Sequence, residues 1–289
     1  MTPRFTKYQA LGNDYLVLDR GPEEAELAPE TIRAICDRNR GPGSDGILIG
    51  GRDGRGAHRL RIFNPDGSEA EKSGNGIRIY ARHLYESRPE AGAEFPLETL
   101  GGRVLVSILH PDGSLVRVDM GEPHFERSAL GLVSAGPGQS ESIIDEKVEF
   151  GGKRCRMTCV SMGNPHSVLR GLPVDASTAR RIGPLVENAS RFPQRTNVQF
   201  LEILSREEIR IEIWERGAGY TLSSGSSSCA AAAAARRLGL VGDSVRVNMP
   251  GGALDIELGS GRALMTGPVE KVYEGRFSPE FIRRWSLGC

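Results

Sequence analysis

The 289-residue sequence has no excess of charge, because 37 basic side chains balance 37 acidic ones and the pI lies near 7.0. Nucleic acids and anionic membrane surfaces attract basic proteins, so we expect neither as a partner. Long apolar runs are missing too, and none approaches the ~18 residues of a membrane-spanning helix. The first residues include Arg4 and Lys7 with no apolar segment behind them, so we expect no secretory signal and a cytoplasmic location.

Cysteine is scarce, with five residues in the whole chain. Only Cys155 and Cys159 are close in sequence, and no second Cys/His pair accompanies them at the spacing of a zinc site. A scattered, odd-numbered set is typical of reduced thiols in a cytoplasmic protein. We therefore expect no metal site.

Two Ser-Gly turns each stand between a strand pattern and a helix pattern. Ser73-Gly74-Asn75-Gly76 follows the alternating stretch His58 to Phe63 and begins an amphipathic segment. Ser224-Gly225-Ser226-Ser227 follows the alternating stretch Glu208 to Trp214 and begins an alanine-rich run. Each pattern predicts a strand, a tight turn and a helix start. Taken singly, such a serine is more often a plain helix cap than a catalytic group.

The separation of the two turns recurs along the chain. The two serines lie 151 residues apart. Further pairs follow in the same order at the same or a similar offset: Gly12-Asn13 with Gly163-Asn164, Asn64 with Glu215, Gly101-Gly102 with Gly251-Gly252, and Met120-Gly121-Glu122-Pro123 with Met265-Thr266-Gly267-Pro268. We interpret the chain as a duplicated unit of domain size.

Two homologous halves usually pack about an approximate twofold axis, which would turn both helix starts toward one cleft. The first turn of a helix has N–H groups without helical partners and the positive end of the dipole, so it suits a carboxylate. Two such ends at one ligand suit chemistry that treats both faces of a carbon alike.

Polar side chains at strand–loop junctions could line a pocket. They are Asn13, Asn64, Asn164 and Asn197, with Glu215 and Arg216 beside the second turn. Loop asparagines are usually turn formers, but arginine and amides together suit a carboxylate and a glutamate suits an ammonium group. This set predicts a pocket for an amino acid. For His166 two interpretations stay open, a general base and a structural role.

Two helices are predicted outside this pattern. One spans 176–189, where Gly183-Pro184 should bend or interrupt it. The other, Pro279 to Trp285, has no counterpart in the first half, and its role is not predicted.

Several motifs resemble the diaminopimelate epimerases, in order from about Phe5 to Tyr273. They are Ala10-Leu11-Gly12-Asn13-Asp14-Tyr15, Ile62-Phe63-Asn64-Pro65-Asp66-Gly67-Ser68-Glu69, Gly74-Asn75-Gly76, Ser161-Met162-Gly163-Asn164-Pro165-His166 and Glu215-Arg216-Gly217-Ala218-Gly219.

This resemblance implies an α/β (α+β) fold with two pseudo-symmetric domains, each a central helix wrapped by a curved, mostly antiparallel sheet. The expected domains are 1–122, joined by the C-terminal segment 270–289, and 123–269, with the active site in the cleft between them. The implied reaction is stereoinversion at the α-carbon without pyridoxal phosphate or another cofactor, from LL- to meso-diaminopimelate. The expected partner is a small amino-acid substrate, and a homodimer is allowed.

The resemblance also assigns site residues by position. Substrate binding is implied for Asn13, Asn64, Asn164, Asn197, Glu215 and Arg216, and for the helix-start residues Gly74, Asn75, Gly225 and Ser226, which hold the reacting carboxylate. The two acid–base positions, cysteines in the family, are Ser73 and Ser224 here. Gly46 stands where the family commonly has a glutamine, and Arg40 and Ser44 alter the same loop.

The serines bear directly on the reaction. A thiol has a pKa near 8.5 that falls further at a helix N-terminus, whereas a serine hydroxyl is not among the groups that titrate near neutral pH. Three hypotheses follow: an epimerase, a protein that binds an amino acid without turnover, and an enzyme of altered chemistry such as dehydration or elimination.

Overall fold

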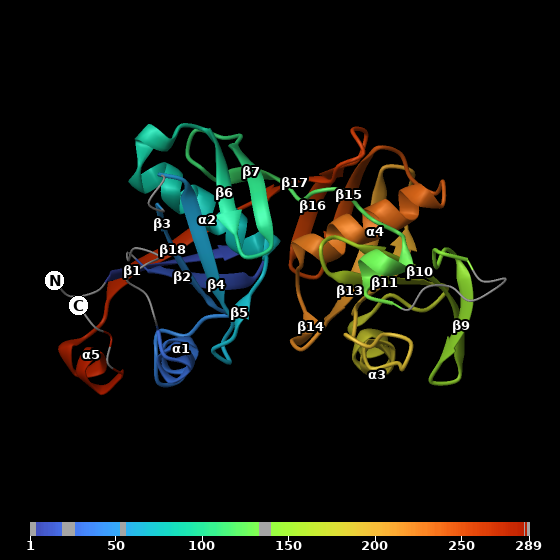
Figure 1. Cartoon of the computed structure of the whole chain (residues 1–289), viewed down its shortest axis with the longest axis horizontal. Coiled ribbons are helices and arrows are strands. Elements are labelled where there is room, and N and C mark those ends of the chain that lie inside the picture. The colour runs from blue at the N-terminus through green and yellow to red at the C-terminus, as the bar shows by residue number, and fades with distance from the viewer. Residues whose placement is uncertain (1–3, 19–26, 53–55, 133–139, 286, 288–289) are drawn as a thin grey trace. The chain divides into compact units, whose positions relative to one another are not determined.

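The computed structural model describes residues 4–18, 27–52, 56–132, 140–285 and 287. The chain divides into two compact units, and Figure 1 shows their elements. The first unit is Met1–Val118 together with Gly267–Cys289, and the second is Asp119–Thr266.

The first unit is built on one run of strands. They are β1 (Arg4–Ala10), β2 (Asn13–Leu18), β3 (Ile47–Arg52), β4 (His58–Phe63), β5 (Glu69–Ala70), β6 (Glu94–Thr99), β7 (Gly102–Ile108), β8 (Leu115–Asp119) and β18 (Glu270–Arg276). The hydrogen-bonded order is β18-β1-β2-β3-β4-β6-β7-β8, with β5 paired to β4. Only β2–β3 and β4–β6 are parallel. Its helices are α1 (Pro29–Cys36), α2 (Gly74–Ser87), the 3-10 turn η1 (Pro89–Ala91) and α5 (Pro279–Trp285).

The second unit repeats this arrangement. Its strands are β9 (Glu146–Phe150), β10 (Lys153–Ser161), β11 (Pro165–Arg170), β12 (Asn197–Ile203), β13 (Glu208–Glu215), β14 (Gly219–Thr221), β15 (Ser244–Met249), β16 (Gly252–Glu257) and β17 (Leu264–Pro268). They pair in the order β9-β10-β11-β12-β13-β15-β16-β17, with β14 on β13. Its helices are the 3-10 turn η2 (Arg127–Leu130), α3 (Ala176–Glu187) and α4 (Gly225–Arg237).

The two runs match strand for strand. β11–β12 and β13–β15 are the parallel pairs of the second unit, at the places where β2–β3 and β4–β6 are parallel in the first. α1 and α3 follow the corresponding strands β2 and β11, and α2 and α4 follow the short strands β5 and β14. The fold class predicted from the sequence is therefore confirmed.

Each repeat encloses one helix. α2 packs on β1, β2, β3, β4 and β7, and α4 packs on β10, β11, β12, β13, β15 and β16. Ile77 and Ile79 of α2 are fully buried, and the alanine run 230–235 of α4 is almost entirely so. Small side chains let the surrounding strands approach α4 closely, and the burial holds both helix starts at fixed positions.

The expected interruption of the helix over 176–189 does not occur. α3 runs through Pro184 and ends at Glu187, because the proline stands in the last turn and removes only one helical hydrogen bond. A side chain at Gly183 would collide with the Trp214 ring, so the glycine permits close packing rather than a break. The C-terminal helix has the predicted bounds, and it packs on α1, where Thr31 Oγ1 donates to the Trp285 carbonyl at 2.8 Å.

The cysteines of the described residues, Cys36, Cys155, Cys159 and Cys229, are buried and form no disulfide bond. Across the same described part of the chain, no helix combines the length and the hydropathy that crossing a bilayer requires.

Candidate active site

Ser73 is the N-cap of α2. Its Oγ accepts from the Gly76 N–H at 3.1 Å, and the first-turn residues Gly74 and Asn75 are buried. The first turn carries no acidic side chain, so nothing there neutralises the positive end of the helix dipole. The Tyr15 hydroxyl lies 3.2 Å from Ser73 Oγ.

Asn13 and Asn75 form a relay of oriented amides next to this cap. Arg78 donates to Asn75 Oδ1 at 2.8 Å, Asn75 Nδ2 donates to Asn13 Oδ1 at 3.0 Å, and Asn13 Nδ2 donates to Asp45 Oδ2 at 3.0 Å. The cation at one end and the carboxylate at the other fix which way both amides point. Arg78 is completely buried, so its charge adds to the positive field at the start of α2.

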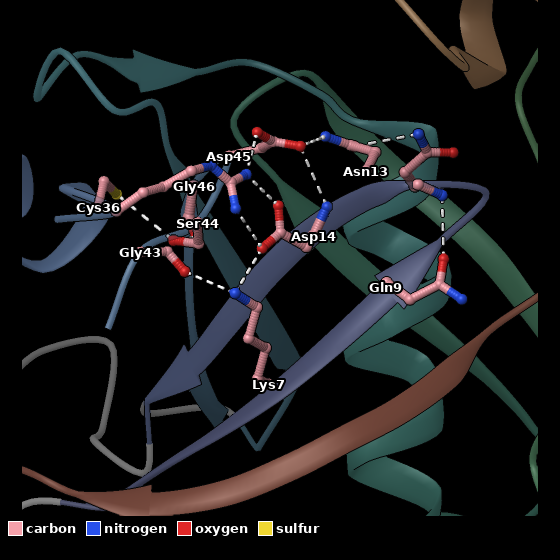
Figure 2. A network of polar contacts seen from close by, with 12 residues as sticks. Lys7, Gln9, Asn13, Asp14, Cys36, Gly43, Ser44, Asp45 and Gly46 are labelled. Atoms are coloured by element: carbon pink, nitrogen blue, oxygen red, sulfur yellow. Dashed lines mark hydrogen bonds and ion pairs between the residues drawn. The ribbon is translucent and has the colours of Figure 1, made fainter. Parts of the chain in front are cut away.

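Charged side chains hold the carboxylate end of the relay (Figure 2). Arg38 bridges Asp14 at 2.5 Å and Asp45 at 2.7 Å, and Lys7 Nζ lies 2.7 Å from Asp14. Burial alone raises the pKa of Asp14, but hydrogen bonds from Arg38 and Lys7 outweigh it, so the pKa lies below its usual value. The Asp14 carboxylate therefore stays ionised at neutral pH.

Gly46 follows Asp45 and leaves space for Tyr15. A Cβ at this position would lie 2.5 Å from the Phe63 carbonyl oxygen and 2.6 Å from Tyr15 Cε1. A side chain at position 46 would therefore collide with both the Phe63 backbone and the Tyr15 ring. This explains in physical terms why the residue is a glycine here.

Asn64 stands apart from the amide relay in its contacts. Its Nδ2 donates to Ser68 Oγ at 3.0 Å within the turn between β4 and β5. The structure thus gives Asn64 the turn role that loop asparagines usually have, and its predicted contact with a substrate stays a prediction.

Ser224 repeats the cap at the start of α4. Its Oγ accepts from the Ser227 N–H at 3.4 Å, and the N–H groups of Gly225 and Ser226 have no partner within the helix. The Ser224 hydroxyl also donates to the Glu215 carboxylate. Burial raises the pKa of Glu215, and the bond from Ser224 offsets part of that rise.

Neutral His166 connects Asn164 to α4. The Gln199 amide nitrogen donates to His166 Nδ1 at 3.1 Å and lies 3.0 Å from Ser227 Oγ, so His166 Nε2 carries the hydrogen and donates to Asn164 Oδ1 at 2.9 Å. Burial, and then the charge of Arg216, lower the pKa of His166 to about 3. Because both ring nitrogens are engaged and the ring is fully buried, the structural interpretation of His166 is favoured over a general base.

Asn197 fastens the loop that carries Arg216. Its Oδ1 accepts from the Arg216 backbone N–H at 2.9 Å, and its Nδ2 donates to the Pro165 carbonyl at 3.0 Å. On the other side of the loop, Glu187 accepts from the Gly217 N–H at 2.9 Å and from Trp214 Nε1 at 2.7 Å. The Arg216 side chain is thereby presented from a backbone fixed at two points.

The structure joins predicted site residues in three pairs, Asn13 with Asn75, Ser224 with Glu215, and Asn197 with Arg216. Sequence reasoning missed a second set that supports them: Tyr15, Asp45, Arg78, Glu187 and Gln199. Arg78 had a signal, since it is a charge on the buried side of an amphipathic helix. Asp45 stood in the glycine-rich loop, but nothing in the sequence connected Gln199 or Glu187 with the site.

Among known proteins, the chain is similar to members of one family. The sequence profile of diaminopimelate epimerase matches residues 5–126 and 158–272. The chain is 44% identical over 281 residues to diaminopimelate epimerase 2 of Nostoc sp., covering 96% of this chain and 97% of the relative. It is 40% identical to the diaminopimelate epimerase of Moorella thermoacetica, covering 94% and 98%.

Among solved structures, a hydroxyproline epimerase from Agrobacterium vitis has the same fold, with a TM-score of 0.67 at 16% identity, covering 96% of this chain and 94% of the other. At that identity the likeness concerns the fold alone. The profile match and the full-length relatives show that this chain belongs to the diaminopimelate epimerase family.

Proposed function

We propose that the chain is an isomerase that inverts the α-carbon of diaminopimelate without a cofactor, as a step toward lysine and peptidoglycan precursors. One observation carries the proposal: each repeat begins its enclosed helix with a serine cap, at Ser73 and at Ser224. Inversion needs a proton acceptor on one face of a carbon and a donor on the other, and the duplication supplies two equivalent positions. A cytoplasmic location is part of this proposal and rests on the scattered cysteines, which form no disulfide bond among the described residues.

The helix starts suit the reacting carboxylate. The first-turn N–H groups of Gly225 and Ser226 have no helical partner, and Gly74 and Asn75 occupy the matching positions in α2. Loss of the α-proton moves negative charge onto the carboxylate oxygens, where fixed N–H dipoles stabilise it. The Arg216 guanidinium suits a carboxylate and the Glu215 carboxylate suits an ammonium group.

Proton removal is assigned to Ser224 with Glu215. The Cα–H bond breaks, its proton joins Ser224 Oγ, and the Ser224 proton passes to the Glu215 carboxylate, which already accepts the hydroxyl hydrogen. The negative charge then resides on the carbon and its carboxylate instead of on an alkoxide. Because burial raises the pKa of Glu215, this carboxylate is a stronger base than an exposed glutamate.

A binding protein without turnover is the second candidate, and one observation favours it. Each cap oxygen already accepts a helix N–H, from Gly76 or from Ser227, and neither serine titrates near neutral pH. Both features reduce the basicity of the serine oxygen and leave ligand binding at the helix starts intact.

Deuterium incorporation separates the candidates. The purified chain is incubated with LL- or meso-diaminopimelate in D₂O, and α-deuteration and inversion are followed by mass spectrometry and chiral chromatography. Exchange with inversion, absent in the Ser73→Ala and Ser224→Ala variants, is the expected result. Calorimetric binding without exchange at high protein concentration would establish the binding function instead, and an unsaturated product would establish elimination.

A further inference from the structure

The hydrogen bonds of Ser73 Oγ determine where its own hydrogen points. Ser73 Oγ accepts from the Gly76 N–H at 3.1 Å and lies 3.2 Å from the Tyr15 hydroxyl, where either oxygen can donate. When the phenol donates, Ser73 Oγ accepts two hydrogen bonds and its own hydrogen points to neither partner. That hydrogen is then the one available to a bound ligand.

Tyr15 is held in this place by the sheet. It lies in β2 directly opposite Tyr8 of β1, and its side chain is 6% exposed. Its ring packs against Gly46, where even a single added carbon would come within 2.6 Å of Cε1. The missing side chain at position 46 thus makes room for a phenol beside the α2 cap.

A serine that gives up a proton needs a neighbouring group to take up the negative charge, whereas a cysteine does not. An unassisted serine would be left as an alkoxide, whereas a thiol with a pKa near 8.5 leaves a stable thiolate. A tyrosine phenol ionises far more readily than a serine hydroxyl, so it can carry the charge instead. Two donors on one oxygen also stabilise negative charge as it develops there.

We propose that Tyr15 is a positioning residue that acts through Ser73 and resupplies its proton, an inference that rests on the proposed function. The Ser73 O–H bond breaks as its proton joins the carbanion, whose electron pair forms the new C–H bond. The pair left on Ser73 Oγ takes the proton of Tyr15, and the phenolate that remains takes a proton from water. In the opposite direction every transfer is reversed.

A double-mutant comparison tests this role. Tyr15→Phe is made in the parent chain and in Ser73→Cys, and α-deuterium exchange and inversion are measured in all four proteins. We expect a loss of about 10²-fold in the parent, the lower range for one acid–base group. In the Ser73→Cys background Tyr15→Phe should reduce the exchange rate very little, because a thiol does not need a proton from Tyr15. If the role of Tyr15 were purely structural, Tyr15→Phe would reduce the exchange rate by the same factor in both backgrounds.

Tyr8→Phe is the matched control. It also removes a buried phenol hydroxyl, but this one contacts His83 Nδ1 at 3.2 Å and Glu86 at 3.3 Å rather than Ser73. Thermal unfolding of each variant reports packing. Should Ser73→Cys fail to fold, Gly46→Ala replaces it. Its added carbon would meet both the Tyr15 ring and the Phe63 carbonyl oxygen. If this variant retains the thermal stability of the parent, it should lose as much exchange as Tyr15→Phe, with no further loss in the double variant.

Each result has a separate meaning. Normal exchange in the parent with no effect of Tyr15→Phe, or an equal effect in both backgrounds, would overturn the role of Tyr15 and leave the proposed function intact. A complete lack of exchange in the parent and in a Ser224→Cys chain that retains Ser73 would overturn both.

Discussion

Glu215 accepts a hydrogen bond from the hydroxyl of Ser224, and this bond opposes the burial that raises the pKa of Glu215. The two residues lie 9 positions apart, at the end of β13 and at the cap of α4. A carboxylate that accepts a hydrogen bond from a serine hydroxyl draws the hydrogen toward itself. The serine oxygen thereby becomes a better proton acceptor. Ser224 and Ser73 therefore differ chemically although they correspond in the repeat, since the partner of Ser73 is a phenol.

Glu215→Gln should reduce α-proton exchange by about 10²–10⁴-fold, the usual contribution of a general base. The amide preserves size and hydrogen bonding but cannot take up the Ser224 proton. Glu212→Gln, in the same strand and bonded to the Tyr220 hydroxyl at 2.8 Å, is the control and should leave the rate unchanged. Equal losses in the two variants would count against Glu215 as the base.

The pH dependence of Glu215 has a definite sign. Only the carboxylate form accepts a proton, so the exchange rate should rise with pH through a pKa above the ordinary glutamate value of about 4.3. For folding, a raised pKa contributes stability that is present below the unfolded pKa and is lost as pH rises through the folded pKa. The free energy of unfolding of Glu215→Gln minus that of the parent should therefore be more positive at pH 8 than at pH 4. Chemical denaturation at the two pH values measures this difference. No change in this difference would contradict the raised pKa.

Restoring cysteine at both caps should raise exchange by orders of magnitude, because the helix dipoles favour a thiolate at each position. The double variant, Ser73→Cys with Ser224→Cys, should exchange the α-proton faster than either single variant, since inversion needs an acid–base group on each face of the carbon. Rates of α-deuteration for the four proteins give the comparison. If the double variant reacts with thiol reagents but exchanges no faster than the parent, the site serves another ligand or another reaction.

His166 should make folding sensitive to acid. Its folded pKa of about 3 lies below the ordinary value of 6.5, so its contribution is complete above pH 6.5 and is lost as pH falls toward 3. The free energy of unfolding of the parent should fall by roughly 1 kcal/mol per pH unit from this residue. His166→Gln should remove that slope, and His110→Gln, at an exposed histidine, should not. Denaturant titrations between pH 7 and pH 5 measure the difference.

Diaminopimelate should bind more tightly than lysine or glutamate. The binding residues predicted from the sequence, Asn64, Asn164, Asn197, Glu215 and Arg216, outnumber those that one amino-acid centre needs. Calorimetric titration with the three ligands provides the test. Equal or tighter binding of a monoamino acid would contradict the prediction, and Gly46 is the first position to examine in that event.

Local patterns in the sequence determined the elements that begin the site. The Ser-Gly turns predicted both helix starts because capping depends on residues within one turn. The offset of 151 residues predicted the repeat, and strand pairing in the two units confirmed it. The helix Pro279–Trp285 was likewise readable from its own residues.

Only the tertiary structure decided what surrounds those helix starts. Tyr15 reaches Ser73 across 58 positions, Asn75 reaches Asn13 across 62, and Gln199 reaches Ser227 across 28. Such contacts depend on strand register and on the side of the sheet that each side chain faces. A shift of one residue turns the side chains of a strand to the other face and would break these contacts. The sequence could therefore place the two serines, while the burial and pairing of the sheets selected the phenol and the carboxylate that accompany them.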